Sequence, residues 1–122
     1  QGCEERVYRA MGTRKLSYVF GGYELTPDSQ PVLDDVYKVL ATCPSTLKVT
    51  VAGYTDNAGD AVANQLISKA RAQAAADALI ARGLAPDRVI VRGFGGALPV
   101  ADNLTAEGRA KNRRVIFTVN AG

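Results

Sequence analysis

The 122-residue sequence contains no histidine and no tryptophan. Histidine is the commonest general base and a usual ligand of zinc and haem, so its absence excludes the usual catalytic triads and most metal sites. A hydrolase would need a nucleophile beside an activated base, and only two cysteines and assorted serines and aspartates are present. We therefore expect no enzyme, no catalytic residue, no metal and no cofactor.

Long apolar runs are absent too, since no stretch of about eighteen apolar residues occurs, and the start at Gln1 shows no basic-then-apolar signal segment. We expect a soluble fragment that begins as a mature or trimmed chain. Aromatic residues make up only 7%, and no basic run is interleaved with them, so nucleic acid is not an expected partner. The net charge of +3 is compatible with an acidic polymer as partner or simply with solubility.

Only two cysteines are present, Cys3 and Cys43. Two thiols are too few for a structural zinc site, and they could form a disulfide or remain two buried thiols. We favour the disulfide, which would tie the N-terminus to the end of a helix predicted over 27–42. It would close a loop of about forty residues, worth roughly 4 kcal/mol in the chain-entropy model. A disulfide would also place the protein outside the cytosol.

Hydrophobic periodicity predicts strands and helices in alternation. Alternating apolar residues predict four strands, over 15–20, 47–52, 88–92 and 112–120. Apolar residues at helical spacing, with suitable capping residues, predict two main helices, over 27–42 and 60–82. One further helical turn is expected from Thr105.

The order β-α-β-α-β-β predicts an α/β fold, a two-layer sandwich with two main helices packed on one face of a mixed four-stranded sheet. With 47% hydrophobic residues, the chain can bury one core, so we expect one domain over 15–120 after an N-terminal lead over 1–14. On the longer helix, one stripe should pack against the sheet: Ile67, Ala70, Ala74, Ala78 and Ala81.

The stretch from Gly53 to Asp60, GYTDNAGD, places two acids, an amide and two glycines between a strand and a helix. Polar loops held by rigid flanks often carry binding residues. The helix that follows could use Asp56 or Asp60 as its N-cap. We favour capping for Asp60.

Two further polar positions stand out. Asn64 and Arg71 are seven residues apart on the longer helix, so they point nearly the same way, about 10 Å apart along its axis. On the last strand, alternation places Arg113 on the apolar side with Val115. An arginine there needs an anion or a carboxylate, or it extends to solvent at the strand end, and the spacing favours neither interpretation.

Several motifs in order resemble a known family. GYTDNAG, then Asn64, SKARA and GRAKNRRV closely match the signature of OmpA-like domains. These are the peptidoglycan-binding domains of outer-membrane proteins, peptidoglycan-associated lipoproteins and flagellar motor stators. The resemblance extends from about Tyr18 to Val119, and the cysteine pair resembles that of actinobacterial members.

The resemblance implies non-catalytic, non-covalent binding of peptidoglycan through the diaminopimelate of its stem peptide, which anchors the parent protein to the cell wall. Asp56 matches the aspartate that receives the ligand's ammonium group, and Arg71 matches the arginine that pairs with its carboxylate. Asn64 matches an amide that helps to hold the ligand, and Arg113 a further binding arginine. Secondary candidates are Tyr54, Thr55, Ala58, Gly22 and Tyr23.

The sequence departs from the family pattern in three places. Tyr54 stands where many members have histidine, Ile67 stands where leucine is usual, and Phe20-Gly21-Gly22-Tyr23 replaces a more polar loop. The alternative is therefore an OmpA-like protein-interaction domain with a weakened or lost peptidoglycan site. The resemblance implies a cell-envelope location, periplasmic or wall-facing, and a membrane-attached parent protein, and it leaves a homodimer open.

Overall fold

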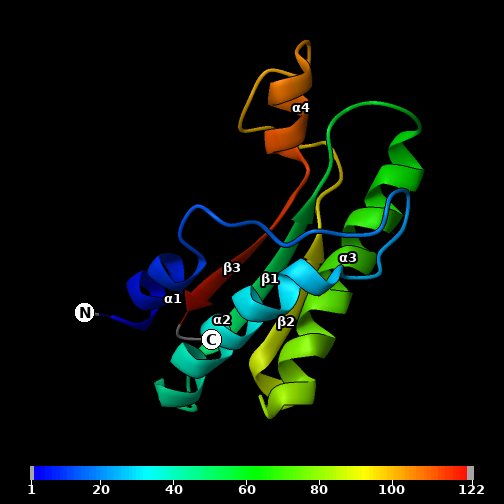
Figure 1. Cartoon of the computed structure of the whole chain (residues 1–122). Helices are drawn as coiled ribbons and strands as arrows, with labels where there is room; N and C mark the ends of the chain where they lie inside the picture. The colour runs from blue at the N-terminus through cyan, green and yellow to red at the C-terminus, as the bar shows by residue number, and fades with distance from the viewer. Residues whose placement is uncertain (1, 121–122) are drawn as a thin grey trace.

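A computed structural model describes residues 2–120 (Figure 1). The elements, in chain order, are α1 (Cys3–Met11), η1 (Pro27–Ser29), α2 (Gln30–Thr42), β1 (Lys48–Tyr54), α3 (Ala61–Arg82), η2 (Pro86–Arg88), β2 (Val89–Gly93), α4 (Ala106–Asn112) and β3 (Arg114–Asn120). Both predicted main helices and three of the four predicted strands are therefore confirmed. None of the described helices combines the length and the apolar character needed to cross a bilayer.

The strands form one mixed sheet in the order β2-β1-β3. Val51 of β1 lies opposite Val91 of the parallel strand β2 and opposite Phe117 of the antiparallel strand β3. Two parallel neighbours need a crossover connection, and α3 supplies it. The predicted α/β fold with a mixed sheet is confirmed, but the sheet has three strands instead of the predicted four.

The missing strand is the segment 15–20. It folds back on the chain just after it through a single bridge between Tyr18 and Leu25, and its backbone hydrogen bonds are made there instead of with the sheet. The Tyr18 hydroxyl donates to the carbonyl of Arg71 in α3, at 2.7 Å. Phe20, the last residue of the predicted strand, is fully exposed.

One hydrophobic core lies between the sheet and the helices α1, α2 and α3. Buried apolar side chains from all of these elements contribute to it, among them Val7, Leu33, Val36, Leu40, Val51, Leu79 and Val115. The helix α1 lies within the predicted N-terminal lead, where no helix was predicted. Its Val7 is 1% exposed, so α1 contributes to the folded core.

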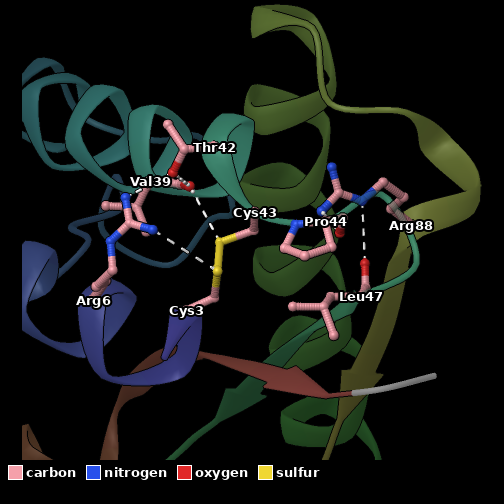
Figure 2. Close-up of a disulfide and its surroundings, with 8 residues drawn as sticks. All are labelled: Cys3, Arg6, Val39, Thr42, Cys43, Pro44, Leu47 and Arg88. Atoms are coloured by element: carbon pink, nitrogen blue, oxygen red, sulfur yellow. Dashed lines mark hydrogen bonds between the residues drawn. A yellow bond between two sulfur atoms is a disulfide. The ribbon is translucent and has the colours of Figure 1, made fainter. Parts of the chain in front are cut away.

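A disulfide joins Cys3 in α1 to Cys43 at the end of α2 (Figure 2). The two Cα atoms are 6.0 Å apart, and the residues are separated by 40 positions. Beside it, Arg6 donates a 2.7 Å hydrogen bond to the Thr42 hydroxyl, so the same two helices are also linked by side chains. The predicted disulfide is confirmed.

Both ends of α3 agree with prediction. Asp60 precedes the helix and accepts a hydrogen bond from the Ala63 amide at 2.8 Å, which is the predicted N-cap. Gly83 follows the last turn with φ of 124°, a conformation that favours glycine. The alanine-rich stretch between the caps forms the whole helix without interruption.

The face of α3 that packs on the sheet was predicted wrongly. Its buried residues are Ser68, Ala72, Ala75, Ala76 and Leu79, whereas Ala81 of the predicted stripe is exposed. The reason lies in Gly53 and Gly93, which are paired across β1 and β2. A Cβ atom at Gly53 would lie 2.0 Å from the Ser68 carbonyl oxygen, and one at Gly93 would lie 2.6 Å from the Lys69 Cβ. The helix backbone therefore lies directly on the two glycines.

The helical turn predicted from Thr105 is a full short helix, α4. The Thr105 hydroxyl accepts a hydrogen bond from the Gly108 amide at 2.9 Å and so caps it. Because α4 continues to Asn112, β3 begins at Arg114, two residues later than the predicted strand.

Candidate ligand-binding pocket

A pocket of about 870 Å³ opens at the carboxyl end of β1. Its walls come from the segment ahead of η1, from the loop between β1 and α3, from the first turns of α3 and from the start of β3. The polar lining residues include Lys15, Tyr18, Thr55, Asp56, Asn64, Arg71 and Arg113. The fold therefore brings all four principal predicted residues, which are spread over 58 positions of the sequence from 56 to 113, to one pocket.

Asp56 lies just beyond β1 and is the acid of this pocket. Its Oδ1 accepts a hydrogen bond from the Ala58 amide at 2.9 Å, and its Oδ2 accepts one from Nη1 of Arg113 at 2.6 Å. The side chain is 12% exposed. Each carboxylate oxygen has a second lone pair, so Asp56 can accept another donor from the pocket.

The environment of Asp56 keeps it ionised. Burial is the largest influence and would raise the pKa of Asp56, but it is outweighed by the hydrogen bonds from the Ala58 amide and Arg113 and by the charges of Arg113 and Arg109. The pKa therefore lies below its usual value of 3.8, and the carboxylate is charged at neutral pH.

Arg113 reaches Asp56 because of the way α4 ends. Asn112, the last residue of α4, is fully buried, and its side chain accepts hydrogen bonds from the amides of Val100 and Ala101 at 2.8 and 2.9 Å. This anchors the start of β3. The sequence left two interpretations open for Arg113, and in the structure the side chain pairs with a carboxylate. The Arg113 side chain is nevertheless 46% exposed.

Arg71 is held in place by the segment that was predicted as a strand. Its Nε donates to the carbonyl of Gly22 at 2.7 Å, and its guanidinium carbon lies 5.3 Å from the centre of the Tyr18 ring. Burial lowers the pKa of Arg71 below its usual value, yet the group stays cationic at neutral pH. Within residues 2–120 no carboxylate lies within 4.0 Å of it. Its two terminal nitrogens are therefore available to an anion.

Asn64 joins α3 to the loop that carries Asp56. Its Nδ2 donates to the carbonyl of Ala58 at 2.8 Å, with a longer contact of 3.5 Å to the carbonyl of Asp56. The Thr55 hydroxyl also donates a hydrogen bond to the carbonyl of Asp56, at 2.7 Å. These bonds fix the loop before any ligand arrives.

The secondary candidates divide into two groups. Thr55 and Ala58 line the pocket, and Gly22 contributes its carbonyl to Arg71. Tyr54 does not line this pocket: its ring lies 5.3 Å from the Phe94 ring and 3.8 Å from the Arg114 guanidinium, and it borders a much smaller cavity together with Arg71 and Arg113. Tyr23 is 60% exposed and does not line the pocket.

Sequence reasoning did not assign several residues that line the pocket, among them Lys15, Tyr18 and Phe20. Tyr18 belongs to the alternating pattern of the predicted strand, but nothing in the spacing linked it to Arg71. Lys15 donates from Nζ to the carbonyl of Ala110 in α4 at 2.7 Å, a contact across 95 positions that no local pattern indicates.

The charges of the pocket suit a ligand that carries both signs. Three cationic side chains, Lys15, Arg71 and Arg113, and the Asp56 carboxylate line it. No cluster of three or more potential metal-ligating side chains occurs in the described part of the chain. The arrangement can bind carboxylates through guanidinium groups and an ammonium group through Asp56.

Fold and pocket together define a small α/β domain with a polar pocket at one end of its sheet. Residues 17–113 match the OmpA family. This match covers most of the chain, and the protein therefore belongs to the OmpA family. The predicted family resemblance is confirmed.

Two curated relatives illustrate the match. The peptidoglycan-binding protein ArfA of Mycobacterium tuberculosis is 46% identical over 99 residues, which are 81% of this chain and 30% of ArfA. The probable lipoprotein YiaD of Escherichia coli is 43% identical over 96 residues, 79% of this chain and 43% of YiaD. The chain thus spans less than half the length of each of these relatives.

Solved structures share the fold. The cell wall anchor of the type VI secretion system of Pseudomonas aeruginosa superposes with a TM-score of 0.81 at 28% identity, covering 98% of this chain and 99% of that one. The peptidoglycan-associated lipoprotein of Burkholderia pseudomallei has a TM-score of 0.81 at 23% identity, covering 91% and 93%. At that identity the second likeness establishes the fold alone.

Proposed function

We propose that this chain is a peptidoglycan-binding domain of the cell envelope, which holds the diaminopimelate of the stem peptide without covalent chemistry and anchors its parent protein to the wall. The observation that carries the proposal is the convergence of Asp56, Asn64, Arg71 and Arg113 on one pocket. The names of the relatives agree with it, since ArfA is a peptidoglycan-binding protein and the Pseudomonas aeruginosa structure is a cell wall anchor.

Each residue has a role that follows from its surroundings. The free end of diaminopimelate carries an ammonium group and a carboxylate. Asp56 accepts the ammonium through its unused lone pairs, while Arg113 and the Ala58 amide hold the aspartate in position. Arg71 presents its two terminal nitrogens to the carboxylate as a fork, and Asn64 orients the loop between them.

The chemistry also gives selectivity. A stem peptide with lysine in place of diaminopimelate has the ammonium group but lacks the neighbouring carboxylate. Arg71 would then remain without an anion in a partly desolvated pocket, and a guanidinium group left without its partner weakens binding. We expect lysine-type stem peptides to bind at least about tenfold more weakly than diaminopimelate-type ones.

Isothermal titration with a soluble diaminopimelate-containing muropeptide tests the proposal. We expect saturable binding that Asp56→Ala or Arg71→Ala abolishes. Arg92→Ala, at an exposed arginine that does not line the pocket, is the matched control and should bind as the wild type does. Unaltered binding in both pocket variants would sink the assignment.

One observation favours a second candidate, a protein-interaction domain with a weakened wall site. Phe20 is fully exposed at the rim of the pocket and Tyr23 is 60% exposed beside it, where a more polar loop would bind sugar and peptide better. Sedimentation with purified sacculi separates the two functions. Retention at low salt supports wall binding, and passage of the domain into the supernatant supports the alternative.

A further inference from the structure

The pocket holds one more cation than a single zwitterionic group uses. In the proposed function Arg71 receives the ligand's carboxylate and Asp56 its ammonium, while Arg113 is already paired with Asp56. Lys15 remains. Among residues 2–120 no carboxylate lies within 4.0 Å of its Nζ, so the lining carries three cations against one carboxylate.

Lys15 is placed to use this charge. Its Nζ donates to the carbonyl of Ala110 at 2.7 Å, which fixes the side chain at the α4 side of the pocket. An ammonium group has three donors, so two are left for a ligand. Lys15 and Arg71 line the same pocket, and the charge of Arg113 acts on both of them. One ligand in this pocket can therefore meet both cations.

The position of Lys15 near other cations favours the binding of an anion beside it. Burial, and then the charges of Arg113 and Arg114, lower the pKa of Lys15 from 10.5. Like charges that share a small volume repel one another, and a carboxylate placed between them replaces that repulsion with attraction.

We propose that Lys15 forms a subsite for a second carboxylate, so that the pocket prefers stem peptides that end at diaminopimelate. This inference rests on the proposed function. Diaminopimelate has two carboxyl groups. When the stem continues beyond it, one of them is consumed in an amide bond, and when the stem ends there, both are free. Trimming of the stem by a peptidase would therefore create the preferred ligand.

Three soluble ligands test the subsite by titration calorimetry at low salt. They are a muropeptide that ends at diaminopimelate, the same muropeptide with that terminal carboxylate amidated, and one extended by a further alanine. We expect the wild type to bind the first about fivefold to tenfold more tightly than the other two, and raised salt should reduce the difference. Lys15→Gln should remove this preference while leaving the amidated ligand bound within about twofold of the wild type.

Two variants serve as controls. Lys48→Gln is matched, because Lys48 is also partly solvent-exposed and its Nζ also donates to a backbone carbonyl, that of Asp87 at 2.6 Å, but it does not line the pocket. It should keep the full preference. Lys15→Arg preserves the charge and should keep most of the preference. An unchanged thermal midpoint of Lys15→Gln shows that the variant is folded.

The outcomes separate this inference from the function on which it rests. Equal affinity of the wild type for the three ligands, with binding still lost in Asp56→Ala, would overturn the subsite and leave the proposed function in place. A Lys15→Gln variant that weakens all three ligands alike would show a general charge effect and would also overturn it. If no ligand binds the wild type, the proposed function fails, and the inference fails with it.

Discussion

Near the amino end of β1, the disulfide Cys3–Cys43 and apolar side chains hold the surrounding segments together. The carboxyl end of β1, in contrast, leads into charged residues and glycines. The seven residues of β1 separate these two regions (Figure 1). The second region has few apolar contacts of its own and depends on hydrogen bonds and on the close contact of α3 with Gly53. Stability and binding should therefore respond to different substitutions.

The largest effect is expected at the disulfide end. The double substitution Cys3→Ser/Cys43→Ser opens a loop of 40 residues and should lower the free energy of unfolding by roughly 4 kcal/mol. Urea unfolding measures this loss. Muropeptide affinity of the folded variant should stay at the wild-type value. A parallel loss of affinity would show that the two ends of β1 are coupled.

Gly53→Ala should lower both stability and ligand affinity, because α3, which carries pocket residues, packs directly on Gly53. The added Cβ would lie 2.0 Å from the Ser68 carbonyl oxygen, so α3 must move, and this helix carries Asn64 and Arg71. We expect a loss of about 3 kcal/mol in unfolding free energy and weaker binding. Gly2→Ala, where an added Cβ meets no atom within 4 Å, is the control and should cost less than about 1 kcal/mol. Equal effects of the two substitutions would contradict the close contact of helix and sheet.

Asp60→Ala separates the two acids of the loop. Asp60 caps α3 through the Ala63 amide and makes no contact with the pocket, so its loss should lower the unfolding free energy by about 1 kcal/mol. Affinity for the muropeptide should change less than about twofold, in contrast to Asp56→Ala. Thermal unfolding and calorimetry on the same samples provide both values. If Asp60→Ala also lost binding, the assignment of the ligand contact to Asp56 and of capping to Asp60 would be wrong.

The smallest expected effect is a pH dependence. Despite burial, the Ala58 amide and Arg113 hold the pKa of Asp56 below 3.8 in the folded chain. A lowered pKa stabilises the fold above the unfolded-state value, and that contribution is lost as the pH falls through the folded-state value. The difference in unfolding free energy between wild type and Asp56→Asn should thus stay constant from about pH 7 to about pH 5 and shrink below about pH 4. A difference that grows on acidification would contradict the assigned direction.

Local sequence patterns correctly predicted those elements whose bounds depend on residues close in the sequence. The alanine-rich stretch with Asp60 before it and Gly83 after it contains the signals that start and end a helix, and α3 has these bounds. The motif around Asp56 and the alternation that placed Arg113 beside Val115 likewise identified residues that line the pocket. These residues are separated in sequence, and the family signature had already linked them.

The features that were not predicted from the sequence depend on packing between residues far apart in the chain. The alternation of Leu16 and Tyr18 is real, but their segment pairs with residues just after it and packs on α3, so no fourth strand forms. The rotation of α3 is set by the absence of side chains at Gly53 and Gly93, which a helical pattern cannot report. Lys15 joined the pocket through a contact to α4 that only the folded chain reveals.

The disulfide also determines how mechanical tension would travel through the domain. A pull on the chain ahead of Cys3 passes through the two sulfur atoms to Cys43 and continues toward β1, so it bypasses residues 4–42 (Figure 2). Lys15 and Tyr18, which form part of the pocket wall, belong to the bypassed segment. The segment that forms part of the pocket wall therefore lies outside the covalent path from Cys3 to β1.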